Sequence, residues 1–178
     1  MLTRDVFCRC PRQSARMPAF PSIGRRALRQ GRVSIPGQVY LLTTVARHRE
    51  CFFANPAQAR AASRVIHAAS TWAGSRLLAW VLMPDHWHGL LQLGVEPLGQ
   101  VMNRFMACAS RALHESCGLD GPPWDRSFHD HALRVEEDIR VVARYIIANP
   151  VRAGLADSVF AYPYWDAVWL DRDASLIL

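Results

Sequence analysis

The sequence predicts an α+β fold of the ferredoxin-like type, in which one antiparallel sheet carries helices on one face. Two observations predict it. Strand-like runs and segments of helical periodicity follow one another in the order β-α-β-β-α-β, and a further helix comes after them. The length of 178 residues also suits one domain with a sizeable core. No apolar run approaches the roughly 20 residues that a membrane-spanning helix needs.

The elements are expected in a fixed order along the chain. They are strand 39–48, helix 56–72, strands 76–83 and 86–93, helix 98–116, strand 129–135 at a sheet edge, and helix 136–149. Local signals support these bounds: Asn55 is a capping residue before the first helix, and Gly74 ends it. Pro84-Asp85 suits the tight turn of a hairpin, and Pro150 is expected to end the last helix. The stretch GLDGPPWDRSF before strand 129–135 looks like a loop.

Positive charge is concentrated at the N-terminus. The chain has 21 arginines and no lysine, and the first 36 residues hold eight of them against one acid, Asp5. We therefore expect residues 1–33 to be a poorly ordered, Arg-rich arm and residues 34–178 to form one domain. A basic arm on a nearly neutral domain suggests a polyanionic partner. A solubilising tail, or an extension upstream of a true start at Met17, remains an alternative.

The start of the chain also bears on location. It lacks the apolar segment of a secretory signal, although an Arg-rich, acid-poor start is compatible with an organellar transit peptide. A cytoplasmic, nucleoid-associated location is the expectation.

The stretch WVLMPDHWHGLLQL places two histidines in one expected strand. Because strand side chains alternate, His86 and His88 point to one face and Trp87 to the other. Two imidazoles side by side can hold a metal ion, but histidines satisfied by core hydrogen bonds or exposed at a strand start are the alternative. A third ligand would favour the metal.

The last helix offers such a ligand. Its apolar stripe is expected at Ile139, Val142, Ala143 and Ile146. Tyr145 and Asn149 lie four residues apart, so both project from one edge beside this stripe. If that edge lies against the histidine face, a divalent cation could be held by His86, His88 and Asn149, with Tyr145 nearby. Otherwise Tyr145 is a half-buried tyrosine and Asn149 a residue chosen to precede Pro150.

In combination, these motifs resemble the REP-associated tyrosine transposases, relatives of insertion-sequence transposases with a single catalytic tyrosine and a histidine–hydrophobic–histidine (HUH) motif. The likeness runs from about Leu28 to Trp169. It is carried by IPGQVYLLTT, MPDHWHGLL, WDRSFHDHALR and RYIIANPVRAGL. Asp85 departs from the family, which often has asparagine there, and the Arg-rich start lies outside the match.

The resemblance implies a metal-dependent transposase that cuts and rejoins single-stranded or hairpin DNA through a 5′-phosphotyrosine. Tyr145 would be the nucleophile, and His86, His88 and Asn149 would bind Mg²⁺ or, better suited to imidazole, Mn²⁺. A monomer is favoured. Candidate DNA-binding residues are Arg25, Arg26, Arg47, Arg49, Arg104, Arg111 and Trp124. A DNA-binding protein without catalysis and a hydrolase using water are the alternatives.

Overall fold

The protein is described by a computed structural model that covers residues 34–134 and 137–169. The expected arm 1–33, with Arg25 and Arg26, lies outside the described residues. Within them, no helix is both long and apolar enough to cross a bilayer.

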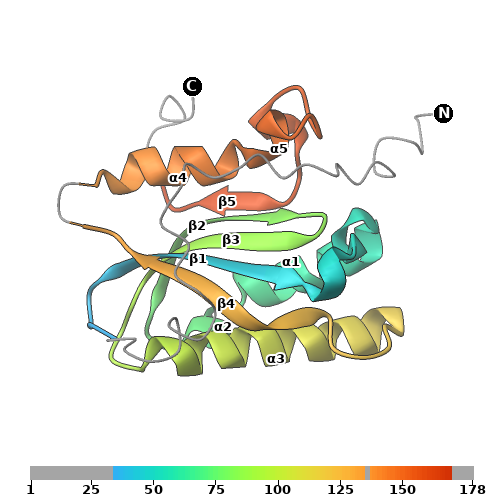
Figure 1. The fold of residues 1–178 in the computed structure, drawn as a ribbon, viewed down its shortest axis with the longest axis horizontal. Coiled ribbons are helices and arrows are strands. Elements are labelled where there is room, and N and C mark those ends of the chain that lie inside the picture. The colour runs from blue at the N-terminus through green and yellow to red at the C-terminus, as the bar shows by residue number, and fades with distance from the viewer. Residues whose placement is uncertain (1–33, 135–136, 170–178) are drawn as a thin grey trace.

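The described residues form one five-stranded antiparallel sheet (Figure 1). Its strands are β1 (Val39–Ala46), β2 (Arg76–Met83), β3 (His86–Gln92), β4 (Trp124–Ala132) and β5 (Trp165–Ala167). They lie in the order β4-β1-β3-β2-β5. The first four strands give the order of a ferredoxin-like sheet, so the predicted α+β class is confirmed. β5 is an added edge strand paired with β2.

Helices cover both faces of this sheet. α1 (Pro56–His67), α2 (Ala69–Trp72) and α3 (Leu98–Cys117) lie on one face, as predicted for the ferredoxin-like core (Figure 1). The C-terminal helices α4 (Ile139–Ile147) and α5 (Asn149–Arg152) lie on the opposite face (Figure 1). Three short 3₁₀ turns, η2 (Arg47–Arg49), η3 (Phe52–Ala54) and η4 (Val159–Ala161), complete the elements. The second face is therefore covered by helical residues from outside the β-α-β-β-α-β unit.

Three expected bounds differ from the observed ones, and each difference has a physical reason. Strand β4 begins at Trp124, inside the stretch expected to be a loop, because Trp124 and Phe128 turn into the core. Helix 56–72 is broken at Ala68, whose backbone is extended (φ −70°, ψ 116°). Pro150 does not end the last helix, because α4 already stops at Ile147. The proline instead lies in the first turn of α5, where no amide hydrogen is needed.

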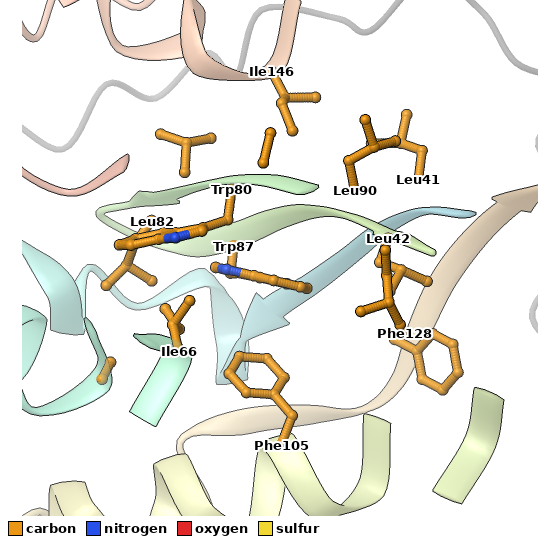
Figure 2. Close-up of a cluster of buried hydrophobic side chains, with 14 of the residues drawn as sticks. Leu41, Leu42, Ile66, Trp80, Leu82, Trp87, Leu90, Phe105, Phe128 and Ile146 are labelled. Atoms are coloured by element: carbon orange, nitrogen blue, oxygen red, sulfur yellow. The ribbon is translucent and has the colours of Figure 1, made fainter. Parts of the chain in front are cut away.

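The core between the sheet and α1–α3 is built around Trp87 of β3. Its indole stacks on Trp72 of α2 at 5.9 Å between ring centroids. It also contacts Phe105 of α3 at 4.7 Å (Figure 2). Gly89 lies on the same face of β3, and a Cβ atom there would come within 2.1 Å of the indole. The HWHG stretch therefore combines one buried tryptophan with the glycine that makes room for it. Its two histidines face the other way.

Candidate functional site

His86 and His88 lie side by side on the face of β3 opposite Trp87, as the alternation predicted. Both side chains are largely buried, with residue exposures of 8% and 5%. Their rings meet edge to face, 4.7 Å apart between centroids. This face of the sheet is the one covered by α4 and α5 (Figure 1). Helix α4 contacts β2 and β3, and α5 contacts β2. Helix α4 carries Tyr145, and α5 begins at Asn149.

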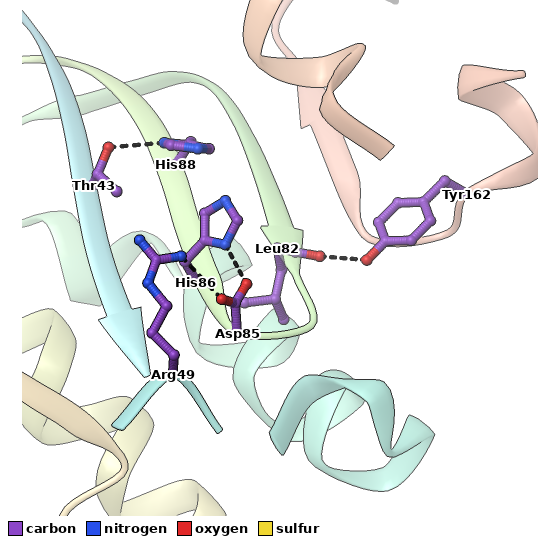
Figure 3. Close-up of polar contacts among 7 residues, drawn as sticks. All are labelled: Thr43, Arg49, Leu82, Asp85, His86, His88 and Tyr162. Atoms are coloured by element: carbon purple, nitrogen blue, oxygen red, sulfur yellow. Dashed lines mark hydrogen bonds and ion pairs between the residues drawn. The ribbon is translucent and has the colours of Figure 1, made fainter. Parts of the chain in front are cut away.

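The orientation of His86 is fixed by a carboxylate. Its Nδ1 lies 2.5 Å from Asp85 Oδ1, and Asp85 Oδ2 accepts a hydrogen bond from Arg49 at 3.0 Å (Figure 3). Burial alone would raise the pKa of Asp85, but His86 and Arg49 outweigh it and hold that pKa below its ordinary value. An ionised carboxylate only accepts, so His86 donates from Nδ1. In neutral His86, Nε2 then keeps a free lone pair for a ligand.

His88 is held by the neighbouring strand. Thr43 is its pairing partner on β1, and the Thr43 hydroxyl lies 2.8 Å from His88 Nδ1 (Figure 3). Burial lowers the pKa of His88 well below its ordinary value, and the neighbouring His86 and Arg152 act in the same direction. His88 is therefore neutral near pH 7. When its Nδ1 donates to Thr43, its Nε2 is also left as an acceptor.

The Nε2 atoms of the two imidazoles would hold a divalent cation only together with a third ligand of another kind. Among the residues that the structure describes, no three His, Cys, Asp or Glu side chains gather as a metal cluster. Asn149 is 7% exposed, and its buried Nδ2 has no hydrogen-bond partner. Two imidazoles and an amide oxygen would suit Mn²⁺ better than Mg²⁺. If the oxygen of the Asn149 amide joins the two imidazoles, the chemistry of this donor set suits the expected cation.

The Arg152 side chain contacts both Tyr145 and Asn149. Its guanidinium carbon lies 3.7 Å from the centroid of the Tyr145 ring. Nη2 donates to Asn149 Oδ1 at 2.5 Å, and Nη1 donates to the main-chain oxygen of Tyr145 at 3.0 Å. Sequence analysis missed Arg152. Its spacing was a usable signal, since position i+7 from Tyr145 returns to the same helical edge.

The other three tyrosines, all within the described part of the chain, are more deeply buried. Tyr40 and Tyr164 are 3% and 8% exposed. Tyr162 is 4% exposed and donates its hydroxyl to the main-chain oxygen of Leu82 at 2.7 Å (Figure 3). Burial raises the pKa of Tyr162, which makes its phenolate less accessible still. Tyr145 is half-buried and packs against the edge of the core, so it is more exposed than the other three tyrosines.

The candidate DNA-binding residues have different surroundings. Arg47 and Arg111 are exposed. Arg49 is tied to Asp85, and Arg104 is paired with Glu96 and donates to the main-chain oxygen of Thr71 at 2.9 Å. Trp124 is 4% exposed and packs on Phe53 at 5.0 Å between ring centroids. Because its ring is covered, we propose no base-stacking role for Trp124.

Comparison with known proteins agrees with the resemblance seen in the motifs. The chain is 33% identical over 86 residues to a REP-associated tyrosine transposase of Escherichia coli (strain K12), across 48% of this chain and 50% of that protein. It thus spans about half the length of the curated relative it matches. A solved REP-associated tyrosine transposase bound to a REP hairpin superposes with a TM-score of 0.60. That match has 24% identity, covers 82% of this chain and 84% of the other, and shows a shared fold. No family model matches the chain.

Proposed function

We propose that this chain is a transposase that cuts and rejoins single strands of hairpin-containing DNA. Tyr145 is the nucleophile, and His86, His88 and Asn149 hold Mg²⁺ or Mn²⁺. One observation carries the proposal: two oriented imidazoles lie on the sheet face that is covered by the helices bearing Tyr145 and Asn149. The resemblance of the chain to REP-associated tyrosine transposases supports the same assignment.

The reaction follows from the chemistry of the tyrosine. The Tyr145 Oη atom attacks the phosphorus of a phosphodiester, the bond from phosphorus to the 3′ oxygen breaks, and the phenol proton ends on the leaving 3′ hydroxyl. The products are a 5′-phosphotyrosine and a free 3′ end. Attack by another 3′ hydroxyl reverses the step and rejoins a strand without ATP. A phenol with an ordinary pKa of about 10 is a weak nucleophile at neutral pH, so the phosphate must be activated.

The protein contributes orientation and charge to this step. When bound, a divalent cation would polarise the scissile phosphate and neutralise its developing charge. His86 is fixed by Asp85 and His88 by Thr43, so the two Nε2 atoms need little reorganisation to act as ligands. Arg152 holds the Tyr145 ring against one face of its guanidinium. These contacts favour a defined position for the nucleophile relative to the phosphate.

We propose hairpin DNA with an unpaired segment as the substrate. The structural relative was solved with a REP hairpin, and its fold covers most of this chain. The net charge of +6 favours a polyanionic ligand, and the exposed Arg47 and Arg111 are available for phosphate contacts. Arg25 and Arg26 are further candidates from the arm. We propose that one chain holds a complete site.

The proposal is tested by covalent capture of DNA. Hairpin oligonucleotides with a labelled unpaired strand are incubated with the protein and Mn²⁺, then separated on a denaturing gel. A labelled protein band that is lost in Tyr145→Phe and retained in Tyr164→Phe is the expected result. Cleavage without any covalent band would indicate a hydrolase that uses water. Hairpin binding with neither product would indicate a DNA-binding protein without catalysis.

A further inference from the structure

Arg152 occupies an unusual position between the nucleophile and the third ligand. We propose that Arg152 is a latch that holds Tyr145 and Asn149 together and gives way when a divalent cation binds. Arg152 acts through these two residues and is a positioning residue. The inference deepens the proposed function, on which it rests, because it assigns a switch to the same site.

The first step of the argument is the geometry of the guanidinium. Its flat face covers the Tyr145 ring at 3.7 Å, while two of its nitrogens donate to the Tyr145 carbonyl and to Asn149 Oδ1. A planar fork of donors makes such simultaneous stacking and hydrogen bonding specific to arginine. One side chain therefore sets the position of the phenol ring and the orientation of the amide.

The second step is the amide of Asn149. Because Arg152 can only donate, it selects the oxygen of the amide, and the buried Nδ2 is left without a hydrogen-bond partner. That buried, unsatisfied group is an energetic cost of the latched arrangement. The oxygen that would be the metal ligand is thus already an acceptor for Arg152.

The third step is charge. A cation on Asn149 Oδ1 would meet the guanidinium across a single oxygen atom, and two positive charges at such separation repel. The charge of Arg152 already acts on His88, since it contributes to the lowered pKa of that imidazole. Arg152 itself is exposed, so its guanidinium can move into water or onto a DNA phosphate. Release of Arg152 is therefore the least costly way to admit the cation.

The test is a Mn²⁺ titration of the folded, full-length protein without DNA, followed by calorimetry or Mn²⁺ EPR. Arg152→Gln removes the charge and the latch, and we expect it to bind Mn²⁺ more tightly by roughly threefold to tenfold. Arg152→Lys keeps the charge but loses the flat fork, so its affinity should lie between the two. Arg140→Gln, at the far end of α4, removes the same charge and should leave the affinity unchanged.

A second comparison separates the latch from a general charge effect. The Asn149→Ala variant lacks the amide oxygen for which Arg152 and the cation compete. In that background, Arg152→Gln should improve Mn²⁺ affinity less than it does in the wild type. Arg152→Gln should also form the covalent DNA adduct more slowly, because Tyr145 loses its support. Thermal unfolding of each variant checks that the fold is kept, and Arg152→Lys replaces Arg152→Gln in the comparison if the latter fails to fold.

Three results overturn the inference. An unchanged or weaker Mn²⁺ affinity in Arg152→Gln would mean that Arg152 only supports Asn149 and the end of α4. An equal gain in the Arg140→Gln control would mean that overall charge, not the latch, sets the affinity. A wild-type protein that binds no Mn²⁺ would overturn the proposed metal site together with the latch, and it is recognised before any variant is compared.

Discussion

The two faces of β3 are built from neighbouring residues and have opposite roles. One face presents Trp87, which is fully buried between α2 and α3 and has Gly89 beneath its ring. The other presents His86 and His88, which are nearly as buried but are held by polar partners. A single strand thus presents an apolar face and a face of polar contacts by the alternation of its side chains. Substitutions on one face should alter stability, and those on the other should alter activity.

The largest expected effect is on the packing face. Trp87→Ala removes the ring that joins β3 to α2 and α3, so the free energy of unfolding should fall by about 3–5 kcal/mol. Denaturant unfolding measures it. Gly89→Ala should act in the same direction, because its new Cβ atom meets the indole ring. A loss below about 1 kcal/mol in Trp87→Ala would break the proposed division of the strand.

Substitutions on the histidine face should lower the rate of DNA cleavage. His86→Ala and His88→Ala should each slow formation of the DNA adduct by about a hundredfold or more, because a cation that stabilises developing charge supplies several kcal/mol. Hairpin binding should persist, since arginine contacts to phosphates carry most of the affinity. Adduct kinetics and a binding assay on the same preparations measure both. A variant that cuts at the wild-type rate, in a reaction that EDTA still inhibits, would place the metal elsewhere.

A smaller effect, on Mn²⁺ affinity, is expected at Asp85, which contacts His86. Asp85→Asn keeps a hydrogen-bond acceptor for His86 but removes the charge, so Mn²⁺ affinity should fall by about tenfold. Asp157→Asn, at an exposed position, is the matched control. Titration with Mn²⁺ measures both variants. Equal affinities for Asp85→Asn and the wild type would show that the carboxylate does not tune His86.

The last effect concerns the pH dependence of stability. The pKa of His88 is lowered in the folded, metal-free protein, so below its ordinary value of about 6.5 the unfolded chain binds a proton that the folded one does not. The stabilisation from neutral His88 is complete above that pH and is lost as the pH falls. His88→Gln should therefore lose less stability than the wild type between pH 7 and pH 5, by up to about 1.4 kcal/mol per pH unit. Identical slopes in EDTA-treated samples would contradict this.

Sequence patterns predicted the two faces of β3 because alternation is a local property. Strand β2 was expected over 76–83, where it is found. The start of β4 was missed because Gly and Pro residues precede it, and its pairing with β1 is a long-range contact. β5 has only three residues and depends on the edge of β2. Short strands whose partners are distant in sequence leave little local signal.

The contacts around the candidate site could be predicted from the sequence only in part, for a similar reason. The spacing of Tyr145 and Asn149 suggested a shared helical edge. Because Pro150 was expected to end the helix, the helical periodicity was not followed as far as Arg152. The partners of the histidines were also not foreseen, because Thr43 and Arg49 approach from β1 and η2 only in the folded chain. Tertiary contacts of this kind can be inferred from a sequence only after the strand order is known.

The proposed reaction requires that Tyr145 becomes covalently attached to DNA. The most direct measurement is mass spectrometry of the protease-digested adduct formed with a hairpin oligonucleotide and Mn²⁺. We expect a nucleotide on the peptide that contains YIIANP, and no adduct from Tyr145→Phe, which removes the hydroxyl with little change in volume. A nucleotide on a peptide bearing Tyr40, Tyr162 or Tyr164, or a Tyr145→Phe variant that still cuts, would contradict the claim.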